Sequence, residues 1–399
     1  MERFKGPTLV LISLSLFLAT GACSKRPAQG TRTSAGNPED PFTYPFVKEF
    51  HLKRRADTEY GSYKAFYLLT EDFEPRVDSN SDLDSIRDVL KFASELSSKH
   101  RIPWTHFVDA NALAPAFLSS DPATKQRCQS MIQDLARMID AGDDCQLHLH
   151  GLLGSALLDH LKAEEKIHIK ESGVAEAQTY RQRKSFFFQS FYRRGYREMV
   201  ASLTYAKRLL EKSLYEGKKQ VLAFRPGGWD HGANSQDTLF YFYALSDAGL
   251  IANSGLSTGT FGGPDFRVGN NPGHNLATIL GGEQRIFEVS PTAGPGGYIN
   301  PVLPHDLNKL SNSAPDEMPV IVAVYHLNAL QKSEGYPDNP AKSDAQLQTE
   351  RDTLEKHFKT VAELAAAKIV YPITLRDLLA IIAGLQDAEA FAGPRQSGG

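Results

Sequence analysis

Two histidines separated by one residue, His148 and His150, close an apolar stretch and are the strongest chemical signal in the sequence. Residues i and i+2 of a β-strand point to the same side, so both imidazoles can reach one point. A carboxylate from a neighbouring strand would complete a two-histidine, one-carboxylate site with positions open for water and substrate. Asp72, at the end of another apolar stretch, is the candidate carboxylate. The pattern favours a metal site over two histidines that only hydrogen-bond at a strand edge.

Other apolar stretches also end in polar side chains. The first ends in Thr70-Glu71-Asp72-Phe73-Glu74, a later one in Arg225-Pro226-Gly227-Gly228-Trp229, and Val320–Tyr325 is followed by His326. In a parallel α/β sheet or barrel, functional groups gather at the carboxyl ends of the strands. We therefore expect these side chains to lie near the two histidines.

Strands and helices alternate in the segments that would position these groups. Ala65–Thr70 is continuously apolar up to its last residue, as a strand buried on both faces would be. Apolar residues then recur at helical spacing over Leu83–Ala93, and Ile102–Val108 can form the next strand. Such alternation predicts βα units and a largely parallel sheet. It breaks between about 152 and 220, a mostly helical and basic insertion.

The order of these motifs resembles the polysaccharide deacetylase (NodB-like) family of carbohydrate esterases. Thr70-Glu71-Asp72 is similar to the family's Thr-x-Asp motif, Gly142–His150 to its metal segment, and Arg225–Trp229 to its Arg-Pro motif. His326 is placed like the family's late histidine, and Ile369–Leu379 like its closing strand and helix. The resemblance implies an α/β fold: an irregular (β/α) barrel of fewer than eight repeats over 46–385, with the helical insertion at about 152–220.

The resemblance also implies a metal-dependent hydrolase that removes N-acetyl, less often O-acetyl, groups from a cell-envelope or extracellular polysaccharide. Asp72, His148 and His150 would hold a divalent ion, zinc or a similar ion such as cobalt, which lowers the pKa of water from 15.7 towards about 7. Glu71 or Glu74 would be the base, and period-two geometry favours Glu74 because it shares a strand face with Asp72.

Further roles follow from the same resemblance. His326 would protonate the leaving nitrogen, and Arg225 would orient a carboxylate through charge-assisted hydrogen bonds. Trp229 could stack on a sugar ring, and Asp230 is a weaker candidate partner for His326.

The chain departs from the family's pattern in two places. The usual acidic pair is Asp-Asp, where this chain has Glu71-Asp72. The second metal histidine commonly lies four residues after the first, where this chain has Leu152 and instead places His150 at i+2. The altered acidic pair keeps open a catalytically inactive, glycan-binding relative. A glycoside hydrolase that uses two carboxylates on a similar barrel is a second alternative.

The first residues predict export. Arg3 and Lys5 precede an apolar run over Leu9–Ala19, too short to span a bilayer, and small residues then lead to Cys23. Leu18–Cys23 resembles the lipobox of bacterial lipoproteins, which implies a signal peptide over 1–22 and acylation of Cys23. Ser24 lacks the aspartate of an inner-membrane retention signal, so we expect an outer-membrane lipoprotein that faces the periplasm.

Composition limits the remaining possibilities. The chain has 399 residues, 41% of them hydrophobic, and a net charge of −3, so neither global disorder nor nucleic-acid binding is expected. We interpret 23–45 as the lipidated cysteine with a flexible tether that leads from the bilayer, and 386–399 as a disordered tail. Cys128 and Cys145 are either two buried thiols or a disulfide.

Overall fold

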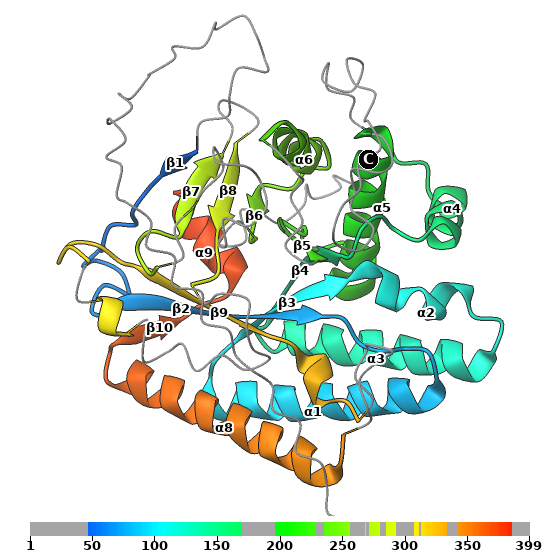
Figure 1. Cartoon of the computed structure of the whole chain (residues 1–399), viewed down its shortest axis with the longest axis horizontal. Coiled ribbons are helices and arrows are strands. Elements are labelled where there is room, and N and C mark those ends of the chain that lie inside the picture. The colour runs from blue at the N-terminus through cyan, green and yellow to red at the C-terminus, as the bar shows by residue number, and fades with distance from the viewer. Residues whose placement is uncertain are drawn as a thin grey trace, which may run out of the picture. The chain divides into compact units, whose positions relative to one another are not determined.

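The computed structural model describes residues 47–169, 196–227, 235–255, 268, 271–279, 285–292, 307–310, 313–332 and 342–384. These residues build one ten-stranded mixed sheet in the order β1-β7-β8-β6-β5-β4-β3-β2-β10, with β9 also paired to β2 (Figure 1). The strands are β1 (Lys48–Glu49), β2 (Ala65–Phe73), β3 (Trp104–Asp109), β4 (Asp144–Leu149), β5 (Ala223–Pro226), β6 (Ala252–Asn253), β7 (Leu276–Ile279), β8 (Ile286–Val289), β9 (Val320–Tyr325) and β10 (Val370–Pro372).

Strand β2 organises the sheet. All nine of its residues are buried, as the run Ala65–Thr70 predicts for the first six of them. It runs parallel to β3, β9 and β10, and the parallel arrangement continues from β3 through β4, β5 and β6 to β8. Since the carboxyl ends of parallel strands share one edge of a sheet, this topology brings together the polar residues that follow β2, β4, β5 and β9. The antiparallel pairs of the described sheet are β1 with β7 and β7 with β8.

The described helices pack against the sheet, most of them on its outer face. They are α1 (Asn80–His100), α2 (Pro115–Leu118), α3 (Pro122–Asp140), α4 (Ser155–Glu164), α5 (Tyr196–Tyr215), α6 (Ser235–Asp247), α8 (Asp344–Ala366) and α9 (Leu375–Ile382), with short 3₁₀ helices η1 (Ala110–Leu113) and η6 (Leu327–Leu330). Neighbours contact one another in the order α8, α1, α3, α5 and α6. Side-chain caps start several of them: Ser79 accepts from Asp82 N before α1, and Ser343 forms a capping box with Gln346 before α8.

The sheet is curved around α9, but the described strands do not close it. Leu375, Leu378 and Leu379 of α9 pack in one core with Phe66 and Leu68 of β2 and with residues of β5 to β9. Beyond β8, Thr292 donates from its backbone to Val322 O of β9 at 3.1 Å, and its hydroxyl accepts from Val322 N at 3.2 Å. Among the described residues, no strand ladder joins the segment after β8 to β9. The predicted α/β class is therefore confirmed, with an open, curved sheet.

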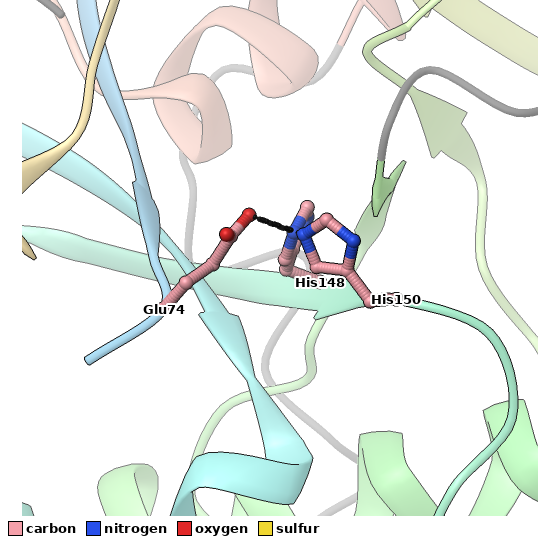
Figure 2. Close-up of side chains that lie close together, drawn as sticks. All are labelled: Glu74, His148 and His150. Carbon is pink, nitrogen blue, oxygen red and sulfur yellow. Dashed lines mark hydrogen bonds and ion pairs between the residues drawn. The ribbon is translucent and has the colours of Figure 1, made fainter. Parts of the chain in front are cut away.

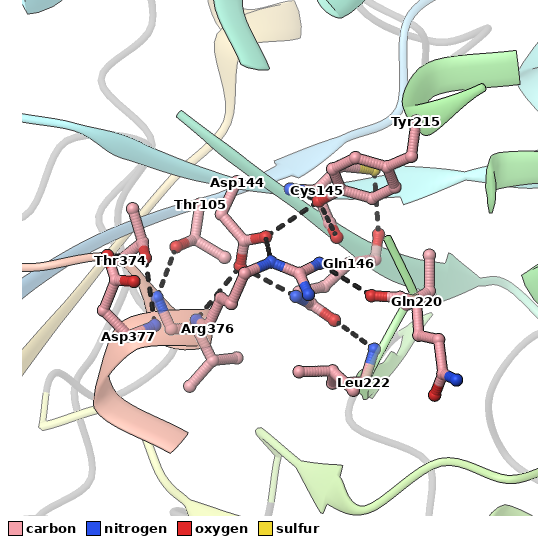
Figure 3. A network of polar contacts seen from close by, with 12 residues as sticks. Thr105, Asp144, Cys145, Gln146, Tyr215, Gln220, Leu222, Thr374, Arg376 and Asp377 are labelled. Carbon is pink, nitrogen blue, oxygen red and sulfur yellow. Dashed lines mark hydrogen bonds and ion pairs between the residues drawn. The ribbon is translucent and has the colours of Figure 1, made fainter. Parts of the chain in front are cut away.

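A buried polar network ties α9 to the amino-terminal ends of the strands (Figure 3). Asp144, the first residue of β4, accepts from Arg376 Nε at 3.0 Å, from Tyr215 Oη at 2.8 Å and from Gln146 Nε2 at 2.7 Å. Arg376 also donates to the carbonyl of Gln220 at 2.7 Å. Because the charges of Asp144 and Arg376 are paired inside the protein, the network holds α9 in one orientation.

Several sequence predictions concern residues outside or at the limits of the described chain. Residues 1–46, 170–195 and 385–399 lie outside it, as do Trp229 and Asp230. Cys128 and Cys145 are both buried and free, which resolves the open alternative in favour of two thiols. Among the described helices, none combines the length and apolar character needed to cross a bilayer.

Candidate metal centre

Side chains alternate between the two faces of β2, so Glu71 lies on one face and Asp72 on the other. Glu71 points outward, where it is hydrogen-bonded to His106 Nδ1, and His106 Nε2 lies 3.3 Å from Asp143. All three side chains are buried. Burial alone would lower the pKa of His106, but the two carboxylates outweigh it and raise that pKa to about 10. The structure therefore does not bring Glu71 to the histidines at the end of β4.

Glu74 is the carboxylate that meets both histidines. Its Oε1 lies 2.6 Å from His148 Nε2 and 2.7 Å from His150 Nε2 (Figure 2). Glu74 follows β2, His148 is the fifth residue of β4, and His150 is the first residue after that strand. The His148 side chain is buried, whereas that of His150 keeps 31% of its surface exposed. The group is thus open to solvent on one side.

The donor atoms of this group fit a divalent cation. His150 Nε2 is buried and close to Glu74 Oε1, yet the pair lacks the alignment of a hydrogen bond. Two imidazole nitrogens and one carboxylate oxygen that converge in this way form a common donor set for zinc and related ions. Glu74, His148 and His150, here called the ligand group, could therefore hold one metal ion.

Asp72 lies beside the ligand group in a different setting. Its Oδ1 accepts from Arg225 Nη1 at 2.7 Å, and its Oδ2 lies 3.7 Å from His326 Nε2. Asp72, Glu74 and His326 also present donor atoms within 4.8 Å of one another. Asp72 was expected with His148 and His150 as the metal carboxylate, but the atoms nearest to both histidines belong to Glu74.

Arg225 is the buried anchor of Asp72. The guanidinium donates to Thr70 Oγ1 at 3.0 Å and, twice, to Ser254, through the hydroxyl at 2.9 Å and the carbonyl at 3.0 Å. It also lies 3.9 Å from the centre of the Phe107 ring. These contacts fix the orientation of the guanidinium. Asp72 Oδ1 therefore accepts its hydrogen bond, and Oδ2 is directed towards His326.

The charges of the site reinforce one another. Burial would raise the pKa of Asp72, but the charges of Arg225, His148 and His326 outweigh it and hold that pKa below its ordinary value. Burial likewise opposes ionisation of Glu74, but the two imidazoles lower its pKa well below the usual range. In turn, Glu74 and Asp72 overcome the effect of burial on His148 and raise its pKa to about 9. Both carboxylates are therefore ionised at neutral pH, and His148 would have to release its proton to ligate a metal ion.

Two residues near the site were not singled out in the sequence. Asp109 ends β3 directly opposite His148 in the ladder between β3 and β4, and burial raises its pKa. Asn328, in η6, donates to the backbone carbonyl of Glu74 at 3.3 Å. Asp109 carries the same signal as the other candidates, a polar residue at the carboxyl end of an apolar strand. Asn328 offers no such signal, because only the fold brings η6 beside β2.

Comparison with known proteins gives neighbours in fold alone. No protein-family model matches the chain, and no curated protein does. A protein from Mycobacterium smegmatis assigned as a polysaccharide deacetylase is 13% identical, with a TM-score of 0.38 over 82% of this chain and 98% of that one. The T48 deacetylase with substrate is 12% identical, with a TM-score of 0.33 over 82% and 96%. The GH57-type branching enzyme from Pyrococcus horikoshii is 9% identical, with a TM-score of 0.43 over 80% and 70%. The neighbours include deacetylases and a branching enzyme, so the choice of activity depends on the site residues themselves.

Proposed function

We propose that this chain is a metal-dependent hydrolase that removes N-acetyl, less often O-acetyl, groups from a polysaccharide. The observation that carries the proposal is the convergence of Glu74, His148 and His150, with Asp72 and His326 directly beside them. Amide hydrolysis needs an activated water, stabilisation of an oxyanion and protonation of a poor leaving group. The group of five side chains contains a candidate for each of these tasks. The order of motifs, which resembles the polysaccharide deacetylase family, supports the substrate class.

Each side chain has a role that its contacts favour. Glu74, His148 and His150 would hold a divalent ion, zinc or a similar ion such as cobalt, which when bound polarises the acetyl carbonyl and acidifies water. Asp72 is the base: Arg225 occupies its Oδ1 and keeps it ionised, so Oδ2 is the oxygen free to take a proton. His326, a quarter exposed and 3.7 Å from Oδ2, is placed to give a proton to the leaving nitrogen.

This assignment exchanges two roles that the sequence suggested. Asp72 moves from metal ligand to base, and Glu74 moves from possible base to metal ligand. The reason is the different partner of each carboxylate, an arginine for Asp72 and two histidines for Glu74. Glu71 has neither role, because it lies on the outer face of β2 with His106.

Metal content and acetate release test the proposal together. The purified chain and a His148→Ala/His150→Ala variant are supplied with zinc or cobalt, and bound metal and acetate released from acetylated glycan oligomers are measured. We expect about one ion per chain and chelator-sensitive acetate release, both lost in the variant. No bound metal in either protein would overturn the proposal. Metal binding without acetate release would favour the glycan-binding relative, and chelator-resistant chain cleavage the glycoside hydrolase.

We also propose that residues 1–22 are a signal peptide and that acylated Cys23 anchors the exported chain to a bilayer, at the outer membrane on the periplasmic side. The proposal rests on the charged start, the short apolar run and the small residues before Cys23. A polysaccharide of the cell envelope would be within reach of such an enzyme.

A further inference from the structure

The imidazole of His150 lies against the backbone of Gly227, the residue that follows β5. A β-carbon on Gly227 would lie 2.4 Å from Cγ, 2.5 Å from Nδ1 and 2.7 Å from Cδ2 of that ring. Carbon atoms in favourable contact are about 3.5–4.0 Å apart. Any side chain at position 227 would therefore force the ring to move by about 1 Å or more.

The ladder between β4 and β5 explains this approach. Leu149 of β4 is paired with Pro226 of β5, so His150 and Gly227 come next on neighbouring parallel strands. Two residues earlier, Arg225 is locked in the interior by its contacts with Asp72, which fixes the path of β5. The backbone of Gly227 thus lies directly against the histidine ring.

His150 needs such support more than His148 does. His148 lies inside the β4 ladder and is buried, whereas His150 lies beyond the last paired residue and is 31% exposed. A ring displaced by about 1 Å would no longer keep its Nε2 2.7 Å from Glu74 Oε1. Small displacements of this size are enough to weaken a ligand site built on tight distances.

We propose that Gly227 is a positioning residue that seats the His150 imidazole towards Glu74, so that β5 shapes the ligand group without supplying a ligand. The steric part of this inference stands on the metal-free geometry. Its consequence for metal affinity rests on the proposed function. Gly154 offers a matched control, because a β-carbon there would meet only Asn111 Oδ1, at an ordinary 3.5 Å.

The first measurement needs no metal. Crystal structures of the metal-free full chain are determined for the wild type, Gly227→Ala and Gly154→Ala. We expect His150 Nε2 to lie more than 3.5 Å from Glu74 Oε1 in Gly227→Ala, and both other proteins to keep the short distance. If the ring stays in place in Gly227→Ala, the inference is wrong. Melting temperatures of the two variants within a few degrees of each other would show that both fold.

Zinc affinity, measured by competition with a chelator, tests the consequence. We expect Gly227→Ala to bind about 10–100-fold more weakly than Gly154→Ala, the range typical for loss of a group that orients a ligand. The Gly227→Ala/His150→Ala variant should bind no more weakly than His150→Ala alone, because both changes remove the same ligand. Equal affinities of Gly227→Ala and Gly154→Ala would overturn the inference. If the wild type binds no zinc but the ring still moves, the proposed function fails and the positioning role stands.

Discussion

Asp72 and Glu74 lie two residues apart at the end of β2, on the same face, and differ in the side chains that they meet. We expect Asp72→Asn to lower acetate release by 100-fold or more and to leave zinc affinity within a few-fold, because the amide cannot accept the proton of water. Glu74→Gln should instead weaken zinc binding by at least about tenfold, because a neutral amide is a poor partner for the cation. Chelator competition and acetate release measured on both variants give the comparison.

The opposite result would restore the assignment that the sequence first suggested. Loss of zinc in Asp72→Asn, with zinc retained in Glu74→Gln, would make Asp72 the ligand. Glu71→Gln serves as the control, since its side chain lies on the outer face with His106. That variant should lose stability and keep its zinc affinity.

His106 gives the clearest pH dependence of a single residue in the described chain. Its pKa is about 10 in the folded protein and about 6.5 in the unfolded chain, because Glu71 and Asp143 hold the imidazolium. Between these two pKa values only the folded state binds this proton. The contribution of His106 to the free energy of unfolding is therefore complete below pH 6.5 and is lost as the pH rises towards 10. We expect His106→Gln to be less stable at pH 7 and to lose fewer degrees of melting temperature between pH 7 and 9. An equally steep decline in both proteins would contradict this role.

At the scale of the elements, α9 depends on a buried ion pair. Asp144→Ala would leave the Arg376 guanidinium buried without its carboxylate, which costs about 3–5 kcal/mol of the free energy of unfolding. Lys99→Ala removes an exposed ion pair with Glu355 and should change stability little. Urea unfolding of both variants measures the difference. A loss in Asp144→Ala no larger than in Lys99→Ala would show that the network does not hold the helix.

The sequence predicts some elements better than others, and burial explains the difference. Ala65–Thr70, the first part of β2, and Val320–Tyr325 are recognisable because strands covered on both faces are rich in consecutive apolar residues. The four-residue strands Leu276–Ile279 and Ile286–Val289 are too short to show a period, and their antiparallel pairing is a contact that only the fold creates. The position of α9 inside the curved sheet is equally non-local, although its Thr374 cap is visible in the sequence.

The same limit applies to the site. Residue types and strand ends pointed to Asp72, Glu74, His148 and His326, because the carboxyl edge of a parallel sheet collects such groups. Which carboxylate meets the histidines depends on how the end of β2 turns beside β4, and local sequence does not determine that path. Gly227 could not be assigned either, because its importance comes from a ring on the neighbouring strand.

At the scale of the whole molecule, chemistry and stability are separated along the strands. His148 lies four residues beyond Asp144 in β4, about 13 Å at 3.3 Å per residue. The carboxyl ends therefore carry the ligand group, and the amino-terminal ends carry the network that holds α9. The hydrogen-bond partners of Asp144 are not those of the ligand group. We therefore expect Asp144→Ala to leave the zinc affinity of the folded fraction unchanged.

Anchoring is the last property of the whole chain that the proposal makes testable. Each buried methylene of an acyl chain contributes about 0.8 kcal/mol to membrane binding, so a diacylated Cys23 would hold the chain firmly and its loss would release it. We expect Cys23→Ser to move the protein from the membrane pellet to the soluble fraction of lysed cells. Zinc content and acetate release from a soluble oligomer should stay the same, because the ligand group begins at Glu74, far along the chain from Cys23. A Cys23→Ser protein that remains in the pellet would show that something other than this cysteine binds the membrane.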